Sequence, residues 1–92
     1  MPVQWTEKAL IDIERVYTFL AQYDRDAAVA LALRLDSAPD KLLVHPRLGE
    51  RVEAYVTKEV RKLTIGRYVM HYEAVGDQIV ILRVWHSREL RR

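Results

Sequence analysis

Apolar residues recur every three or four positions along the first part of the chain, which is the spacing of one helix face. This pattern predicts an amphipathic helix from about residue 7 to 22, with Thr6 as its N-cap and a short strand at residues 3–5 before it. The apolar face consists of Ala9, Leu10, Ile13, Val16, Tyr17 and Leu20. The charged residues that fall mainly on the opposite, solvated face are Lys8, Asp12, Glu14 and Arg15.

A second helical pattern follows after only a few residues, so we expect an antiparallel helical hairpin. Asp24 is its N-cap candidate, and its stripe is dominated by small residues that permit close packing: Ala27, Ala28, Leu31, Ala32, Leu35 and Ala38. Pro39 predicts a break near residues 37–38, because proline removes a helical hydrogen bond and clashes with the preceding turn. Proline is tolerated in a first turn, so we expect Pro39 to open a further short turn that carries Leu42 and Leu43 to the core.

The period changes to two in the second half of the chain, after a loop at residues 45–49 that Pro46 and Gly49 punctuate. Val52, Ala54 and Val56 alternate with polar residues, which predicts a half-buried strand at 51–57 and a turn near 58–59. A further strand is expected at 60–65, ending at a turn at Gly66.

The most apolar stretch is a β-hairpin, with strands at 68–75 and 79–85 joined by Gly76-Asp77. Its second strand is almost uniformly apolar from Ile79 to Leu82, so we expect a central strand that is covered on both faces. The fold class is therefore α+β: a short strand, two helices and about four further strands in an antiparallel meander. The tail, residues 89–92, is expected to fray.

The length of 92 residues fits one domain, residues 1–92, with a single core. The chain contains no cysteine and three scattered histidines, so we expect no metal site and no cofactor. No secretory signal and no membrane-spanning stretch is recognisable, which predicts a cytoplasmic protein without a membrane partner.

Charge is divided unevenly along the chain. Residues 1–44 carry five Lys/Arg against seven Asp/Glu, whereas residues 45–92 carry ten against six. The half that holds most of the sheet is thus the basic half, which indicates an acidic partner or simply a solvated surface. The cationic side chains with candidate roles in binding are Arg61, Arg67, Arg83, His86 and Arg88, with Lys62 beside them.

Strand alternation decides which of these side chains can cooperate. His86 is expected to share a face with Leu82 and Val84. Arg83 should point to the opposite face with Ile79 and Ile81, so Arg83 and His86 form one site only if a bulge or the strand end redirects one of them. An RNA-cleaving site would need a base, an acid and a cation at one phosphate, and it would draw on His86, Arg83, Arg88 and Arg61. His71 reads most simply as a structural histidine with a hydrogen-bonded partner, and His45 as a loop residue.

Five segments, in this order, resemble the RelE/ParE superfamily of small toxins from bacterial toxin–antitoxin pairs, over almost the whole chain. They are Trp5-Thr6-Glu7-Lys8-Ala9, His45-Pro46-Arg47-Leu48-Gly49, Val60-Arg61-Lys62-Leu63, Tyr68-Val69-Met70-His71-Tyr72, and Ile79-Val80-Ile81-Leu82-Arg83-Val84-Trp85-His86. The resemblance implies a helical hairpin packed on a curved, mainly antiparallel sheet, and a cognate antitoxin that wraps the toxin and neutralises it.

The resemblance also implies one of two targets. ParE-like members are taken to poison DNA gyrase by protein binding, whereas RelE-like members are ribosome-dependent endoribonucleases of messenger RNA. The nuclease branch commonly has an arginine where this chain has Val69, and a tyrosine near the position of His86, after which this chain has no tyrosine. These departures favour the ParE-like reading, with the RelE-like nuclease and a non-toxic antitoxin-binding member as alternatives.

Overall fold

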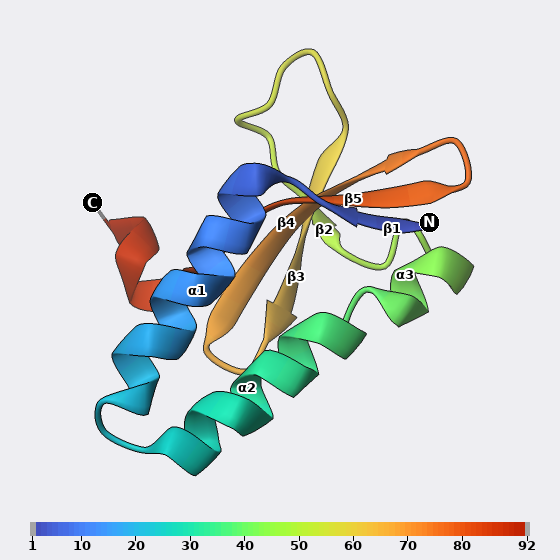
Figure 1. The fold of residues 1–92 in the computed structure, drawn as a ribbon. Helices are drawn as coiled ribbons and strands as arrows, with labels where there is room; N and C mark the ends of the chain where they lie inside the picture. The colour runs from blue at the N-terminus through green and yellow to red at the C-terminus, as the bar shows by residue number, and fades with distance from the viewer. Residues whose placement is uncertain (1, 92) are drawn as a thin grey trace.

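A computed structural model describes residues 2–91 of the chain. Within residues 2–91, three helices, five strands and a closing 3₁₀ turn follow one another in the order shown in Figure 1. The elements are β1 (Val3–Trp5), α1 (Glu7–Ala21), α2 (Arg25–Ser37), α3 (Asp40–Val44), β2 (Glu50–Arg51), β3 (Val60–Ile65), β4 (Tyr68–Val75), β5 (Gln78–His86) and η1 (Ser87–Arg91). The order agrees with the α+β class that the hydrophobic pattern predicts.

The helix starts are those that the capping residues predict. The Thr6 hydroxyl accepts a hydrogen bond from the Ala9 amide at 3.1 Å, and the Asp24 carboxylate accepts one from the Ala27 amide at 3.0 Å. Each bond satisfies an amide that the first helical turn would otherwise leave without a partner. As expected from Pro39, α2 ends at Ser37 and a short α3 begins at Asp40.

The sheet has the strand order β1-β5-β4-β3-β2. Strands β2 to β5 form the predicted antiparallel meander, and β1 pairs in parallel with β5 through residues 3–5 and 79–81. The first strand of the chain therefore lies beside the last one. At residues 79–81, β5 lies between β1 and β4 and is an interior strand, as predicted. Val80 and Leu82 are only half-buried, so the prediction that both faces of β5 are covered is wrong.

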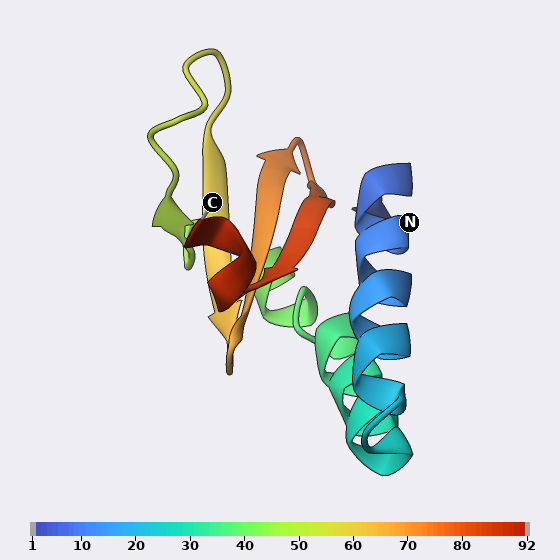
Figure 2. The same ribbon diagram turned by 90° about the vertical axis from the view of Figure 1, so that its left-hand side faces the viewer.

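Helices α1 and α2 form one layer, and the sheet forms a second layer beside it (Figure 2). The largest fully buried side chains come from both layers and include Leu35, Leu42, Met70, Tyr72, Ile81 and Val84. Burial of these apolar groups is the main favourable contribution to folding. Leu42 reaches the core as predicted, whereas Leu43 is 39% exposed because the single turn of α3 directs only one of the two leucines inward.

A β-bulge in β5 changes which residues face the helices. Tyr72 pairs with Ile81 but the preceding His71 pairs with Arg83, so Leu82 is the extra residue. Ile81 and Val84 consequently both face the core, at 0% exposure. The sequence pattern had grouped Arg83 with Ile79 and Ile81, and this grouping is wrong because the bulge reverses the alternation between Ile81 and Arg83.

The predicted strand at 51–57 is wrong beyond Arg51. Strand β2 pairs with β3 at only two positions, after which the Val52 amide donates to the Val60 carbonyl at 2.8 Å. Strand β3 begins at Val60, so residues after Val52 have no strand to pair with and form the long loop in Figure 1. Val56, expected on the buried side, is 89% exposed. The tail also differs from expectation, because η1 orders residues 87–91; Arg92 lies outside the described residues.

Candidate functional site

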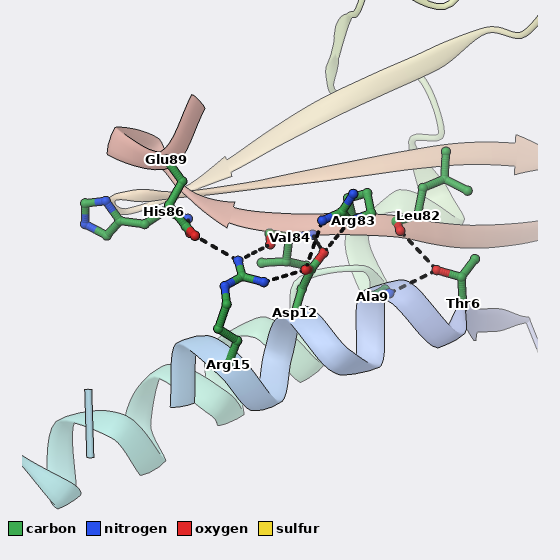
Figure 3. A network of polar contacts seen from close by, with 9 residues as sticks. All are labelled: Thr6, Ala9, Asp12, Arg15, Leu82, Arg83, Val84, His86 and Glu89. Atoms are coloured by element: carbon green, nitrogen blue, oxygen red, sulfur yellow. Dashed lines mark hydrogen bonds and ion pairs between the residues drawn. The ribbon is translucent and has the colours of Figure 1, made fainter. Parts of the chain in front are cut away.

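Asp12 lies at the centre of a polar network between α1 and β5, which Figure 3 shows from close by. Its Oδ2 accepts from Arg83 Nε at 2.7 Å and from the Val84 amide at 2.9 Å, while its Oδ1 accepts from Arg15 Nη1 at 2.6 Å. The residue is only 2% exposed. The expectation that Asp12 faces solvent is therefore wrong, because α1 turns this side chain towards the strand edge, where two guanidinium groups compensate its charge.

The charge of Asp12 is stabilised by these partners. Burial alone would raise the pKa of Asp12, but the hydrogen bonds from Arg83, from the Val84 amide and from Arg15 outweigh burial and hold the pKa below its ordinary value. Asp12 is thus ionised at neutral pH and binds Arg83 through both of its oxygens, since Arg83 Nη2 also donates to Oδ1 at 3.2 Å. Such two-point, charge-assisted contacts fix the guanidinium in place.

Side chains take the place of a neighbouring strand along the rest of β5. Beyond Ile81, β5 has no strand on its outer edge within residues 2–91. Thr6 Oγ1 donates to the Leu82 carbonyl at 3.0 Å, and Arg15 Nη2 donates to the Val84 carbonyl at 3.3 Å. Glu89 Oε1 accepts from the His86 amide at 2.8 Å and from Arg15 Nη2 at 3.1 Å. With Asp12, these groups satisfy an edge that would otherwise be open to other strands.

Two of the five candidate cations are therefore engaged inside the molecule. Arg83 is bound to Asp12, and its guanidinium lies 4.8 Å from the ring centroid of Trp85. Arg61 donates to Glu59 Oε2 from Nε at 3.0 Å and from Nη2 at 2.7 Å, and its Nη1 donates to the Gly49 carbonyl at 2.8 Å. Both arginines hold parts of the fold together, and neither has a free pair of guanidinium N–H donors for a phosphate.

The other three candidates, Arg67, His86 and Arg88, lie together at one end of the sheet. His86 pairs with Tyr68 across β4 and β5, with the two ring centroids 5.1 Å apart, and the Ser87 amide donates to the Arg67 carbonyl at 2.8 Å. The Arg88 amide donates to His86 Nδ1 at 3.1 Å. The side chains of Arg67 and Arg88 are exposed. We call these three residues the basic end.

A hollow of about 490 Å³ opens beside the basic end, between α1 and η1. Its lining combines apolar side chains with charged ones: Arg15, Val16, Phe19, Leu20, Tyr68, His86, Arg88 and Glu89. Sequence reasoning missed this hollow. The available signal was Phe19, a large aromatic residue outside the apolar stripe of α1, which is 62% exposed in the structure.

Arg83 and His86 remain on opposite faces of β5. Arg83 pairs with His71 and His86 with Tyr68, and these partners alternate along β4. The bulge lies before both residues in the chain, so it moves them together and does not bring them to one face. The expected separation is confirmed.

His71 is a buried histidine on the face of the sheet away from the helices, with 8% exposure. Its ring meets those of Trp85 and Tyr55 edge-on, at 4.6 and 6.0 Å between centroids. Burial, together with the positive charges of Lys62 and Arg83, lowers the pKa of His71. His71 is buried, as a structural histidine would be, but the expected hydrogen-bonded partner is missing at Nδ1 among the described residues.

We expect His71→Phe to raise the free energy of unfolding by about 1 kcal/mol at pH 7, because it removes a buried polar atom that lacks a partner. Since the folded pKa of His71 is lowered, the unfolded chain takes up the proton first as the pH falls, and the wild-type protein loses stability on acidification. The advantage of His71→Phe should therefore widen from pH 7 to pH 5. Chemical denaturation of both proteins at each pH measures this difference in stability, with His45→Gln, at an exposed histidine, as control. A difference that stays constant between pH 7 and pH 5 would contradict the lowered pKa of His71.

The helical hairpin leaves large apolar side chains in solvent. Leu10 and Ile11 on α1 are 55% and 57% exposed, and Val29 and Leu33 on α2 are 44% and 65% exposed. Groups of exposed apolar residues of this size are typical of protein contact surfaces. Among residues 2–91, no helix has the length and hydropathy of a membrane span, and no three acidic or histidine side chains lie in a group that could hold a metal ion.

Comparison with known proteins identifies the family of this chain. The family model described as the ParE toxin of the type II toxin–antitoxin system parDE matches residues 3–91. The chain belongs to the ParE toxin family. As a ParE-family protein it is a toxin of a type II toxin–antitoxin system, which confirms the superfamily that its sequence resembles.

Two curated relatives of this ParE-family protein carry names from the RelE branch of the superfamily, and the name of a third refers to neither branch. It is 31% identical to Toxin RelE2 of Caulobacter vibrioides over 88 residues, which are 96% of this chain and 97% of the relative. It is also 31% identical to Toxin RelE1 of the same organism, over 91% of this chain and 90% of the relative, and 28% identical to Putative toxin Y4kP of Sinorhizobium fredii.

A solved structure shares the fold of this ParE-family protein. A chain of the chromosomal ParDE toxin–antitoxin system from P. aeruginosa superimposes with a TM-score of 0.76, over 94% of this chain and 95% of the other. The sequence identity is 22%, so this likeness concerns the fold.

Proposed function

We propose that this toxin inhibits DNA gyrase by binding it and that a cognate antitoxin neutralises it in the cytoplasm. The observation that carries the proposal is the Asp12–Arg83 ion pair, with its 2.7 Å contact at a carboxylate that is 2% exposed. A nuclease of this fold would need a cation beside its acid or base at one phosphate. Here Arg83 is held by Asp12 and lies on the face opposite His86, which favours action by protein binding.

The basic end supplies the contacts that we propose for the target. Arg88 lines the hollow together with Phe19 and Tyr68, and the exposed Arg67 precedes Tyr68 in the chain, so positive charge lies at one side of an apolar depression. An acidic surface on the target would be attracted to these cations before close contact, which raises the association rate. The sequence also made Arg61 and Arg83 target-binding candidates. In this proposal they stabilise the fold and do not contact the target.

The antitoxin is proposed to cover the helical hairpin. Leu10, Ile11, Val29 and Leu33 provide an exposed apolar surface along two adjacent helices, which suits the apolar face of an amphipathic segment. The solved relative from P. aeruginosa is part of a ParDE toxin–antitoxin system, which supports a partner of this kind. Strand addition along β3 would extend the contact, because β2 pairs with β3 only at Arg61 and Lys62.

A ribosome-dependent messenger-RNA endoribonuclease is the second candidate function. It is favoured by the names of the two Caulobacter relatives, Toxin RelE1 and Toxin RelE2, each at 31% identity. In that case His86 would be the acid or base, with Arg88 as the nearest candidate cation in the chain, since its amide contacts His86 Nδ1.

Gyrase supercoiling and messenger-RNA cleavage in translating ribosomes, tested side by side with the purified chain, separate the candidates. We expect inhibited supercoiling and intact RNA. The charge-reversed double variant Arg67→Glu/Arg88→Glu should bind gyrase about tenfold more weakly, with the loss concentrated in the association rate and in low salt. Lys8→Glu, a reversal at an exposed cation on α1, is the matched control.

Cleaved RNA with normal supercoiling would overturn the gyrase proposal in favour of the nuclease, and His86→Ala would then be expected to abolish cleavage while the fold survives. A chain that affects neither process yet binds its antitoxin would instead be a non-toxic member of the family.

A further inference from the structure

Two side chains of the sheet, Tyr72 and Arg61, hold the loop at residues 45–49 by hydrogen bonds to its backbone. The Tyr72 hydroxyl accepts from the Gly49 amide at 2.9 Å and donates to the Pro46 carbonyl at 2.7 Å. Arg61 Nη1 donates to the Gly49 carbonyl at 2.8 Å. Burial raises the pKa of Tyr72, so its hydroxyl keeps the proton that it donates to Pro46. Each of these contacts spans more than ten residues of sequence, and together they fix the loop backbone.

Gly49 makes this clamp possible. A Cβ at this position would lie 2.6 Å from the Lys62 carbonyl oxygen and 2.7 Å from Tyr72 Cε1. The loop backbone therefore rests directly on β3 and on the Tyr72 ring. Tyr72 is itself fully buried, with 0% exposure, so the support under the loop is part of the core. These contacts restrain the loop backbone at Pro46 and Gly49 before any partner binds.

The clamped loop and the end of α3 before it expose apolar side chains. Val44 is 73% exposed and Leu48 is 51% exposed, and they border a shallow hollow of about 570 Å³ lined by residues 44–48. We call residues 44–48 the loop surface. A rigid backbone that holds apolar side chains in solvent gains nothing for the stability of the free protein. It does lower the entropic cost of binding, because the contact geometry is set in advance.

The charge beside these apolar groups indicates what they contact. Arg47 is 80% exposed, and its approach to Glu59 is distant, at 3.9 Å. Glu59 Oε2 is already held at 2.7 Å by Arg61. The guanidinium of Arg47 is thus available next to Leu48, so the complementary surface is apolar with a carboxylate at its border.

We propose that the loop surface is an inhibitory loop that inserts into the toxin's protein target, with Leu48 and Val44 in an apolar depression and Arg47 paired with an acidic residue at its border. The proposal rests on the proposed function and adds a second contact to the basic end. A large folded enzyme can reach both, because the longest extent of the toxin is 38 Å. A preformed loop suits a preformed pocket, whereas a segment that orders on binding suits the long apolar surface of α1 and α2.

Leu48→Asp tests the loop surface in surface plasmon resonance against purified gyrase and in the supercoiling assay. We expect binding to weaken by about 30-fold, as for loss of a central apolar anchor. Val75→Asp is the matched control, because Val75 has the same 51% exposure and lies at the turn between β4 and β5. The gyrase affinity of this control should stay within about twofold of the wild type. Circular dichroism checks that both variants are folded.

Tyr72→Phe tests the clamp, since it keeps the ring in the core and removes only the hydroxyl that holds Pro46 and Gly49. Hydrogen exchange of the Gly49 amide should accelerate, and gyrase affinity should fall about fivefold at a temperature where the variant is fully folded. A purely structural role of Tyr72 would lower the melting temperature and leave the affinity unchanged, which would overturn its positioning role.

The possible failures are distinguishable. If the wild-type chain inhibits gyrase and Leu48→Asp inhibits it equally well, the loop proposal is overturned and the proposed function stands. If Leu48→Asp loses antitoxin affinity while gyrase inhibition is unchanged, the loop surface belongs to the antitoxin and the proposal is likewise overturned. If the unmodified chain has no effect on gyrase, the proposed function fails, and gyrase is excluded as the partner of the loop.

Discussion

Replacement of Asp12 by asparagine should lower the free energy of unfolding by about 3 kcal/mol at neutral pH. The change removes the negative charge that Arg83 and Arg15 contact, at 2.7 and 2.6 Å, and turns one acceptor into a donor at a site that is 2% exposed. An amide cannot accept from Arg83, Arg15 and the Val84 amide together. The two arginines are 34% and 39% exposed, so water solvates them in part and keeps the loss below that of a fully buried pair.

The pH dependence of stability should change in the same variant. Because the folded pKa of Asp12 lies below its ordinary value, the unfolded chain binds the proton more readily. The contribution of Asp12 is therefore fully present above the ordinary pKa of an aspartate, about 4, and is lost as the pH falls through the folded pKa. Asp12→Asn should show a smaller loss of stability between pH 5 and pH 3 than the wild type.

Urea denaturation at several pH values measures both effects, and Asp36→Asn is the matched control because Asp36 is an exposed aspartate of α2. The control should stay within about 0.5 kcal/mol of the wild type. Equal stability of Asp12→Asn and Asp36→Asn at pH 7 would show that the network contributes nothing to the fold.

Gly49→Ala should destabilise the protein by about 3 kcal/mol, because a methyl group at this position overlaps the Lys62 carbonyl and the Tyr72 ring. Neither neighbour can move easily: one is the backbone of β3 and the other is a fully buried side chain. The φ angle of Gly49 is not positive, so the backbone conformation itself would accept alanine. The cost should arise from space alone.

Gly76→Ala provides the contrast, since a Cβ there has nothing within 4 Å but the residue has a φ of 60°. Its expected cost is about 1–2 kcal/mol, which comes from backbone conformation. Thermal unfolding of both variants compares the two effects. A smaller loss for Gly49→Ala than for Gly76→Ala would mean that the loop lifts from the sheet at little cost, and the rigidity of the loop surface would then be refuted.

Local signals in the sequence predicted most of the fold. Thr6 and Asp24 mark helix starts, Pro39 marks a break, and Gly76-Asp77 marks a tight turn, because each residue acts on the backbone within a few positions. The strand at 51–57 failed because pairing depends on a partner, and β3 begins only at Val60. The bulge at Leu82 was also missed, since an extra residue in an apolar run leaves the run unchanged.

The candidate site was less predictable, because its decisive contact joins residues that lie 71 positions apart. Asp12 reads as a solvated helix residue until β5 lies beside it, and only then does Arg83 cease to be a free cation. The grouping of Arg67, His86 and Arg88 has the same origin, since the turn after β3 and the end of β5 meet only in the folded sheet. The family could be recognised from ordered segments, whereas the basic end required the tertiary structure.

The parallel pairing of β1 with β5 has a consequence for how the molecule folds. Thr6 contacts Ile81 and Leu82, so the first strand and the start of α1 gain their partners only when the last strand is present. Contacts between residues so distant in sequence close large loops and form slowly. During synthesis the helical hairpin can form early, but the sheet stays incomplete until β5 has emerged. The toxin sheet can therefore close only after its last strand has been synthesised, whereas the helices belong to the part of the chain that is synthesised first.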